Sequence, residues 1–207
     1  MICLKKGLER FVHRVDRLEA LVRRGELLTG RDRDVYLASF LIELPTAFAL
    51  LARSAYLAGA MSGRTARGVC MRPRLFPNRN AALLGAAQLF KKAPAHVPGR
   101  DEPSWQSLDQ LARIAANISL ANAADFGTAT SMFPAAGTVV TATRNFYAHR
   151  TRHTLEKLRD DLRRHYGISL AAHPSDSLTV PLASRPSPLV WEWAGNYRDM
   201  AEALCGA

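Results

Sequence analysis

Apolar residues recur every three or four positions near the start of the chain. This spacing places them on one face of a helix. Six residues follow it: Leu4, Leu8, Phe11, Val15, Leu18 and Val22. Gly25 comes directly after this run, and glycine is common where helices end. The pattern predicts an amphipathic first helix that buries a single stripe of side chains.

A second apolar segment, residues 34–61, is hydrophobic around most of its circumference, as a central helix of a bundle is. Thr29 or Asp32 can cap its start. Pro45 should kink it, because proline removes a backbone donor and clashes with the preceding turn. We expect a long, buried central helix.

Within this segment, residues 35–61 are the best candidate for a membrane span. Glu43, Pro45 and Arg53 interrupt its apolar run, so that no stretch long enough to cross a bilayer is expected. Glu43 could pair with Arg53 or support Arg144, and a local ion pair is the expectation. Residues 1–10 carry charges where a signal peptide needs apolar residues. We therefore expect no membrane contact and a cytoplasmic location.

The middle of the chain alternates loops and helices. Residues 62–80 contain five arginines, two glycines and two prolines but no acidic residue, which indicates a basic loop. Such a loop could track phosphates or could be a solvated connector. A short apolar helix is expected over residues 81–90. A longer helix should begin at Ser104, or at Ser107 with Gln110 in a capping box, and run to about residue 129.

Proline and glycine also divide the last part of the chain. Pro134 and Gly137 should break it, and a long helix from Thr138 or Thr141 to Tyr166 should follow, capped by Gly167. Residues 168–188 contain four prolines and predict an extended arm that can add a short strand. Residues 189–204 predict a closing helix. The sum is an all-α bundle with a long central helix, a basic loop and a C-terminal extended arm plus helix.

The charge balance adds a class of partner. Lys and Arg number 28 against 18 Asp and Glu, a formal net charge of +10. This favours polyanions, whose condensed counterions are released on binding, although a basic surface can also serve solubility alone. The cysteines Cys3, Cys70 and Cys205 are far apart, which fits a reducing compartment. We expect neither a metal site nor a cofactor.

One short motif combines the residue types that phosphate chemistry needs. Arg144 and Asn145 are followed by His149 in the expected first turns of the long helix. Asn145 and His149 are one helical turn apart, and the long side chain of Arg144 can reach the same ligand. Free N–H groups at a helix start would favour an anion there.

These side chains suit RNA cleavage by attack of the ribose 2'-OH on its own phosphate. Histidine can accept or donate a proton near neutral pH. Arginine can stabilise the charged phosphorane, and asparagine can orient either partner. One histidine cannot easily serve as both base and acid. Two copies facing each other in a homodimer would complete the site.

The motif resembles the R-x4-H motif, in its R-N-x-x-x-H form, of the HEPN superfamily of ribonucleases. The motif covers six residues, and the helical layout of residues 1–166 agrees more loosely. The resemblance implies a single HEPN-like domain over residues 1–207, with a core bundle in 1–167 and an arm and closing helix in 168–207. It also implies metal-independent cleavage that leaves 2',3'-cyclic phosphate and 5'-OH ends.

The biological setting is likewise implied by the resemblance alone. It points to a toxin or antiviral defence effector with an antitoxin or another defence protein as partner. In HEPN toxins silenced by a nucleotidyltransferase, a tyrosine usually follows the histidine by two positions. Thr151 stands at that position here, which argues against that route of control.

Basic residues directly after the motif are candidates for RNA binding. Arg150, Arg152 and His153 form this cluster, and a solvated face is the alternative. Arg144 and His149 could themselves be structural. The alternative function is a noncatalytic HEPN-like helical adaptor that binds a partner protein or RNA. A DNA-binding regulator is disfavoured, because no helix-turn-helix pattern is evident.

Overall fold

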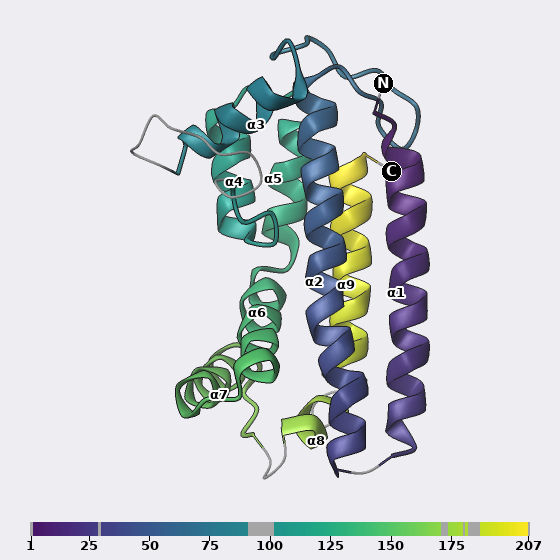
Figure 1. Cartoon of the computed structure of the whole chain (residues 1–207), viewed down its shortest axis with the longest axis vertical. Helices are drawn as coiled ribbons and strands as arrows, with labels where there is room; N and C mark the ends of the chain where they lie inside the picture. The colour runs from purple at the N-terminus through teal and green to yellow at the C-terminus, as the bar shows by residue number, and fades with distance from the viewer. Residues whose placement is uncertain are drawn as a thin grey trace. The chain divides into compact units, whose positions relative to one another are not determined.

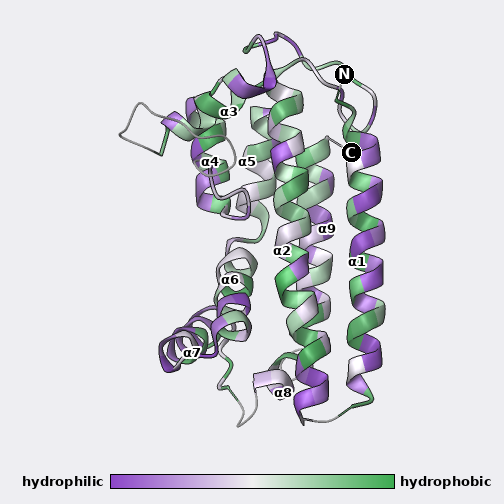
Figure 2. Cartoon of the chain, in the orientation of Figure 1, coloured by the Kyte–Doolittle hydropathy of each residue, from purple (hydrophilic) through white to green (hydrophobic). Residues whose placement is uncertain are grey.

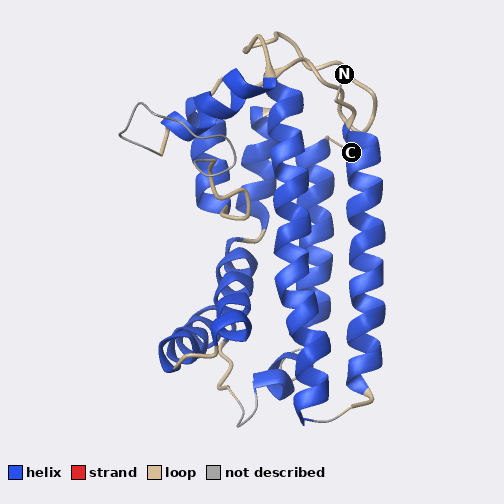
Figure 3. Ribbon diagram, viewed as in Figure 1, coloured by secondary structure: helices blue, strands red, loops and turns tan. Residues whose placement is uncertain are grey.

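The computed structural model describes residues 2–28, 30–90, 102–170, 174–179, 181 and 187–206. Within these ranges the chain is helical, and strand-like pairing is limited to isolated bridges of Arg64 with Cys3 and Cys70. The expected all-α class is therefore confirmed (Figures 1 and 3). The helices are α1 (Leu4–Glu26), α2 (Gly30–Ala60), α3 (Arg79–Gln88), α4 (Leu108–Asn117), α5 (Ala123–Met132), α6 (Pro134–His149), α7 (Arg152–Tyr166), α8 (Pro174–Thr179) and α9 (Leu189–Cys205).

The helices belong to two compact units, each built from segments that are far apart in the sequence. The first unit combines Met1–Phe11, Phe48–Met132 and Asp199–Ala207, and the second combines Val12–Ala47 and Phe133–Arg198. Helices α1, α2 and α9 contribute to both units. Each unit thus depends on contacts between distant parts of the chain.

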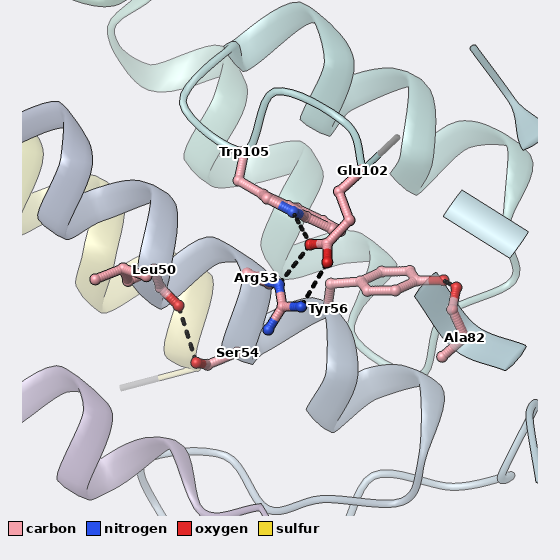
Figure 4. Close-up of polar contacts among 7 residues, drawn as sticks. All are labelled: Leu50, Arg53, Ser54, Tyr56, Ala82, Glu102 and Trp105. Atoms are coloured by element: carbon pink, nitrogen blue, oxygen red, sulfur yellow. Dashed lines mark hydrogen bonds and ion pairs between the residues drawn. The ribbon is translucent and has the colours of Figure 1, made fainter. Parts of the chain in front are cut away.

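In the first unit, a partly buried ion pair joins α2 to the segment before α4 (Figure 4). Arg53 of α2 donates two hydrogen bonds to the Glu102 carboxylate, from Nε at 2.5 Å and from Nη2 at 2.6 Å. The Trp105 indole N–H donates to the same carboxylate at 2.9 Å. Because Arg53 is paired with Glu102, the expected pair of Arg53 with Glu43 is wrong.

The helix expected up to residue 129 is two helices. Ser107 caps α4 by accepting from the Gln110 backbone N–H, which confirms one of the two proposed starts. The Gln110 side chain instead accepts from the Ser104 N–H at 2.8 Å. Ile118 is extended and ends α4, and α5 begins at Ala123. The predicted continuous helix is therefore wrong.

Backbone hydrogen bonds fix the conformation of the basic loop over residues 62–80. The Arg64 N–H donates to the Ile2 carbonyl at 2.8 Å, and the Arg64 carbonyl accepts from Leu4 at 3.0 Å. The Ala66 N–H donates to the Cys205 carbonyl at 2.8 Å. The Arg74 guanidinium donates to carbonyls within the loop. The loop therefore has defined structure and ties together residues from both ends of the chain.

In the second unit, α1 and α9 are joined through polar contacts. Arg198 donates to Glu19 at 2.6 Å and to Asp16 at 2.7 Å. Arg14 pairs with Glu43 of α2. The buried stripe of α1 and the core residue Trp193 of α9 confirm the predicted first and closing helices.

The chain turns between α6 and α7, where one long helix was expected. Helix α6 begins at Pro134 and ends at His149, and Arg150 adopts the left-handed conformation with φ 48°. Thr151 then caps α7, which ends at Gly167 with φ 67° as predicted. Helices α6 and α7 pack against each other. The expected start at Thr138 or Thr141 and the expected continuity to Tyr166 are wrong.

The expected extended arm contains a helix, α8. No strand occurs in the described part of residues 168–188; residues 171–173, 180 and 182–186 lie outside the described ranges, so the rest of the arm prediction is not addressed. Thr29 also lies outside them. Asp32 is in the first turn of α2 and not before it, so it is not the cap that was expected.

Helix α2 continues through Pro45 and is 31 residues long. By length and composition it could cross a membrane, and it is the one described helix that passes this test. The core helix of a water-soluble protein passes the same test, and residues such as Phe40 and Leu44 are fully buried here. The expectation that Pro45 and its neighbours leave no sufficiently long segment is wrong as to length. The hydropathy of α2 is seen in Figure 2.

Candidate functional site

The candidate catalytic residues lie in the last turns of α6. Arg144 and Asn145 occupy adjacent positions, and His149 is the final helical residue. The predicted spacing of one turn between Asn145 and His149 is retained, because both belong to the same helix. Their predicted place at a helix start is wrong. The free backbone N–H groups at the start of α6 therefore do not lie next to the motif, contrary to expectation.

Arg144 has few partners for a side chain that is partly buried. Its Nη1 donates to the Asn145 Oδ1 at 3.0 Å. Its Nε is buried and has no hydrogen-bond partner within the described residues. An arginine that is removed from water ordinarily pairs with a carboxylate or satisfies its donors otherwise. A donor on Arg144 is thus left over, beside the Asn145 amide.

His149 is exposed, in contrast to the apolar side of α6. The helix ends at this residue because Arg150 turns the chain, and the Arg150 N–H donates to the Phe146 carbonyl at 2.7 Å. Helix α7 begins at Arg152, with Thr151 and Thr154 in a reciprocal capping box. His149 therefore lies just before the positive end of the α7 dipole. Its imidazole is accessible to a ligand.

A buried carboxylate holds the turn that follows His149. Asp34 of α2 has only 8% of its side chain exposed, and it lies 3.8 Å from the Arg150 Nη2. The Tyr147 hydroxyl donates to the Asp34 Oδ1 at 3.3 Å. The Arg150 guanidinium also lies 5.8 Å from the centre of the Tyr147 ring. These contacts compensate for the left-handed backbone at Arg150, which a non-glycine residue rarely adopts.

The environment of Tyr147 follows from this arrangement. Burial raises the pKa of Tyr147, and the nearby Asp34 carboxylate raises this pKa further. The hydroxyl therefore remains protonated and continues to donate to Asp34. The Tyr147 side chain is only 5% exposed. Sequence analysis did not identify Asp34, because nothing in the local pattern connects α2 with α6.

The three candidate RNA-binding residues differ in their surroundings. Arg150 is half exposed and interacts with Asp34. Arg152 is 92% exposed and forms an i,i+4 pair with Glu156, a type of contact that is weak in water. His153 is exposed in the first turn of α7. His153 is therefore in a different helix from His149, which ends α6.

The described residues include no cluster of three or more His, Cys, Asp or Glu side chains that could hold a metal ion. The site as observed therefore offers a guanidinium, an amide and an imidazole. Only a single chain is present, so the two-fold composite site stays a prediction. RNA binding by the candidate residues also stays a prediction.

Comparisons of the chain with protein-family models, with curated proteins and with solved structures give no match in any of the three.

Proposed function

We propose that this chain is a metal-independent endoribonuclease of the HEPN type. In the proposed reaction, the ribose 2'-oxygen forms a bond to the adjacent phosphorus while the bond from phosphorus to the 5'-oxygen breaks. A base takes the 2'-OH proton and an acid supplies a proton to the leaving 5'-oxygen. The products are a 2',3'-cyclic phosphate and a 5'-OH end.

The observation that supports this proposal best is the state of Arg144. Its partly buried guanidinium has a donor without a partner in the described part of the chain, and it adjoins an amide on the helix that carries the exposed His149. A phosphate oxygen would satisfy such a donor, and the fixed cation would stabilise the phosphorane.

The division of proton transfers argues for two copies. Each chain supplies one His149, while the reaction needs a base and an acid in the same turnover. A homodimer that brings two such imidazoles to one phosphate would supply both. The activity per chain should then fall when the protein is diluted below the dissociation constant of the dimer, as measured by light scattering and by initial rates.

The decisive experiment is RNA cleavage in the presence of EDTA. Wild-type protein should cut RNA, and His149→Ala should abolish cleavage with an unchanged helical circular dichroism spectrum. His165→Ala is the matched control, because His165 is another exposed histidine at the end of a helix, and it should cut at the wild-type rate. Undiminished cleavage by His149→Ala would reject the assignment.

The same experiment distinguishes the adaptor. Wild-type protein that binds RNA and leaves it intact across many substrates would favour a noncatalytic HEPN-like helical protein. Work as a toxin or defence effector in the cytoplasm, with an antitoxin or another partner protein, rests on the HEPN resemblance alone and belongs to the proposal.

A further inference from the structure

Helix α1 presents a row of basic residues on the side away from its buried stripe. The row consists of Lys6, Arg10, His13, Arg17 and Arg24, all of which are exposed. They belong to one uninterrupted helix. At 100° per residue, the five positions lie within about 60° of one another around the helix axis. The row from Lys6 to Arg24 is about 27 Å long at 1.5 Å per residue.

The acidic residues of α1 do not neutralise this row. Glu9 borders it, while Asp16, Glu19 and Glu26 lie outside the sector that the row occupies. Asp16 and Glu19 are already bound by Arg198. Within the described residues, no ion pair involves a member of the row. Four formal cations are thus left to solvent along a single line.

Helix α7 is also rich in basic residues, but it differs from α1 because some of its cations are paired with acidic residues of the same helix. On α7, Arg152 pairs with Glu156, and Lys157 pairs with Asp161. Asp160 is a further exposed acid on the same helix. The charges of α7 are mixed, as on an ordinary solvated surface, whereas those of the α1 row have one sign. In Figure 2, α1 alternates hydrophilic and hydrophobic bands, as its two faces require.

We propose that the α1 row binds the phosphate backbone of RNA, as a surface that holds RNA without reading its bases. Three of its four formal cations are arginines, whose planar fork matches phosphate oxygens. The row has no aromatic member for base stacking. This inference rests on the proposed function only in taking RNA as the polyanion, and it does not require cleavage.

A lipid surface is the competing polyanion, and the structure disfavours it. Helices that bind membranes insert their apolar face into the bilayer. The apolar stripe of α1 is already buried within the protein; Val15, for example, has no exposed surface. No apolar face of α1 remains for insertion, while a narrow line of cations fits a linear chain of phosphates.

The test compares two triple variants in the His149→Ala background, which keeps RNA intact. The row variant carries Arg10→Gln, Arg17→Gln and Arg24→Gln. The control carries Lys5→Gln, Arg14→Gln and Arg23→Gln, three basic residues of the same helix outside the row. Each lowers the formal net charge by three from +10. Binding of a labelled single-stranded RNA is measured by fluorescence anisotropy over a range of salt concentrations.

The row variant should bind RNA at least about tenfold more weakly, and the slope of log affinity against log salt should fall by about 2. The control should change affinity less than about threefold. Replacing the same three arginines by lysine should restore most of the binding, because the charge is kept. Circular dichroism verifies that each variant is folded.

Equal losses in both triple variants would show that only net charge matters and would overturn the inference. Unchanged binding by the row variant would overturn it as well. Row-dependent binding to phosphatidylserine vesicles, without row-dependent RNA binding, would assign the row to a membrane surface instead. If wild-type protein fails to cut RNA but binds it through the row, the proposed nuclease fails and this inference stands.

Discussion

Arg53 and Arg144 are both partly buried, but they differ in how fully other residues of the chain accept hydrogen bonds from their guanidinium groups. In the first unit, Arg53 directs two nitrogens at the Glu102 carboxylate, which also accepts from Trp105 (Figure 4). The hydrogen bond to Glu102 raises the pKa of Arg53. In the second unit, the Arg144 guanidinium donates a hydrogen bond to the Asn145 amide, and its Nε has no hydrogen-bond partner among the described residues.

The difference separates a structural arginine from one that can bind a ligand. The fork of Arg53 is occupied by a carboxylate of the same chain, so its role is to fix the segment before α4. The fork of Arg144 retains a donor, and leaving that donor buried costs free energy unless a ligand satisfies it. A stability cost retained on the helix that carries an exposed histidine is what a functional site would show.

A missing partner alone is insufficient, as a third residue shows. The Asn122 Oδ1 in the first unit is also buried without a partner in the described structure. A Cβ added at Gly59 would lie 1.8 Å from this oxygen, so the space beside it is filled by backbone. The Arg144 Nε is also buried, but Arg144 belongs to the helix that carries the exposed His149. The comparison therefore depends on the neighbouring residues as well as on hydrogen bonding.

The largest expected effect is on catalysis by Arg144. Arg144→Met should lower RNA cleavage by about 100- to 1000-fold, because the phosphorane loses its cation. The free energy of unfolding should change by less than about 1 kcal/mol, because no carboxylate loses a partner. Initial rates in EDTA and urea denaturation measure the two effects. Wild-type rates in the variant would remove the main support for the site.

Arg53 should show the reverse pattern. Arg53→Met removes the Arg53 guanidinium and its two hydrogen bonds from the Glu102 carboxylate, which has 9% of its side chain exposed, and should reduce the free energy of unfolding by about 3 kcal/mol. Adding Glu102→Leu should recover at least about 1 kcal/mol, because the carboxylate that lost the Arg53 cation is removed. Urea denaturation of the single and double variants gives the values. A double variant less stable than the single one would contradict a charge-based explanation.

A smaller loss of stability is expected where Gly59 and Asn122 are in close contact. Gly59→Ala should destabilise the protein by about 2 kcal/mol, because the added methyl group meets the Asn122 amide. Asn122→Ala introduced together with it should cost less than the sum of the two single changes, since the overlap is relieved. Thermal unfolding of the four proteins measures this coupling. Strict additivity would mean that the two residues do not crowd each other.

The smallest effect should come from Asp34. Asp34→Asn removes the negative charge beside Tyr147 and should lower the pKa of Tyr147 towards its ordinary value near 10, with a loss of stability of about 1 kcal/mol. Absorbance of the phenolate during titration measures this pKa, and Tyr147→Phe identifies the signal. An unchanged pKa would show that burial alone controls this hydroxyl.

The raised pKa of Tyr147 also fixes the direction of a pH effect. The folded state disfavours the phenolate form of Tyr147. The contribution of the protonated Tyr147 hydroxyl to the free energy of unfolding is therefore complete below about pH 10, the ordinary pKa of tyrosine in an unfolded chain. It is lost progressively as the pH rises above this value. Tyr147→Phe should weaken this alkaline loss relative to wild type, as measured by urea denaturation at increasing pH.

Sequence patterns predicted the elements that have local signals. The apolar spacing of α1 and the glycine at Gly167 both correspond to observed structure. So does Ser107 as a helix cap. Each of these signals acts within a few residues, through side-chain periodicity or backbone geometry. The closing helix α9 belongs to the same group.

The turn after His149 could not be predicted in this way, because its main support is distant. Position 150 is occupied by arginine, whereas glycine or asparagine usually occupies a left-handed position. Asp34 of α2 supplies the compensating contacts. Thr151 and Thr154 did offer a weaker local signal for a new helix start. The residues of the candidate motif were found from sequence, whereas their position at the end of α6 required the structure.

Hydrogen bonds in the basic loop carry a practical consequence for protein engineering. Arg64 binds the Ile2 carbonyl and Ala66 binds the Cys205 carbonyl, so that two residues from opposite ends of the sequence meet the same short stretch of backbone. A brief peptide linker could therefore join these ends, and the chain could be reopened elsewhere as a circular permutant.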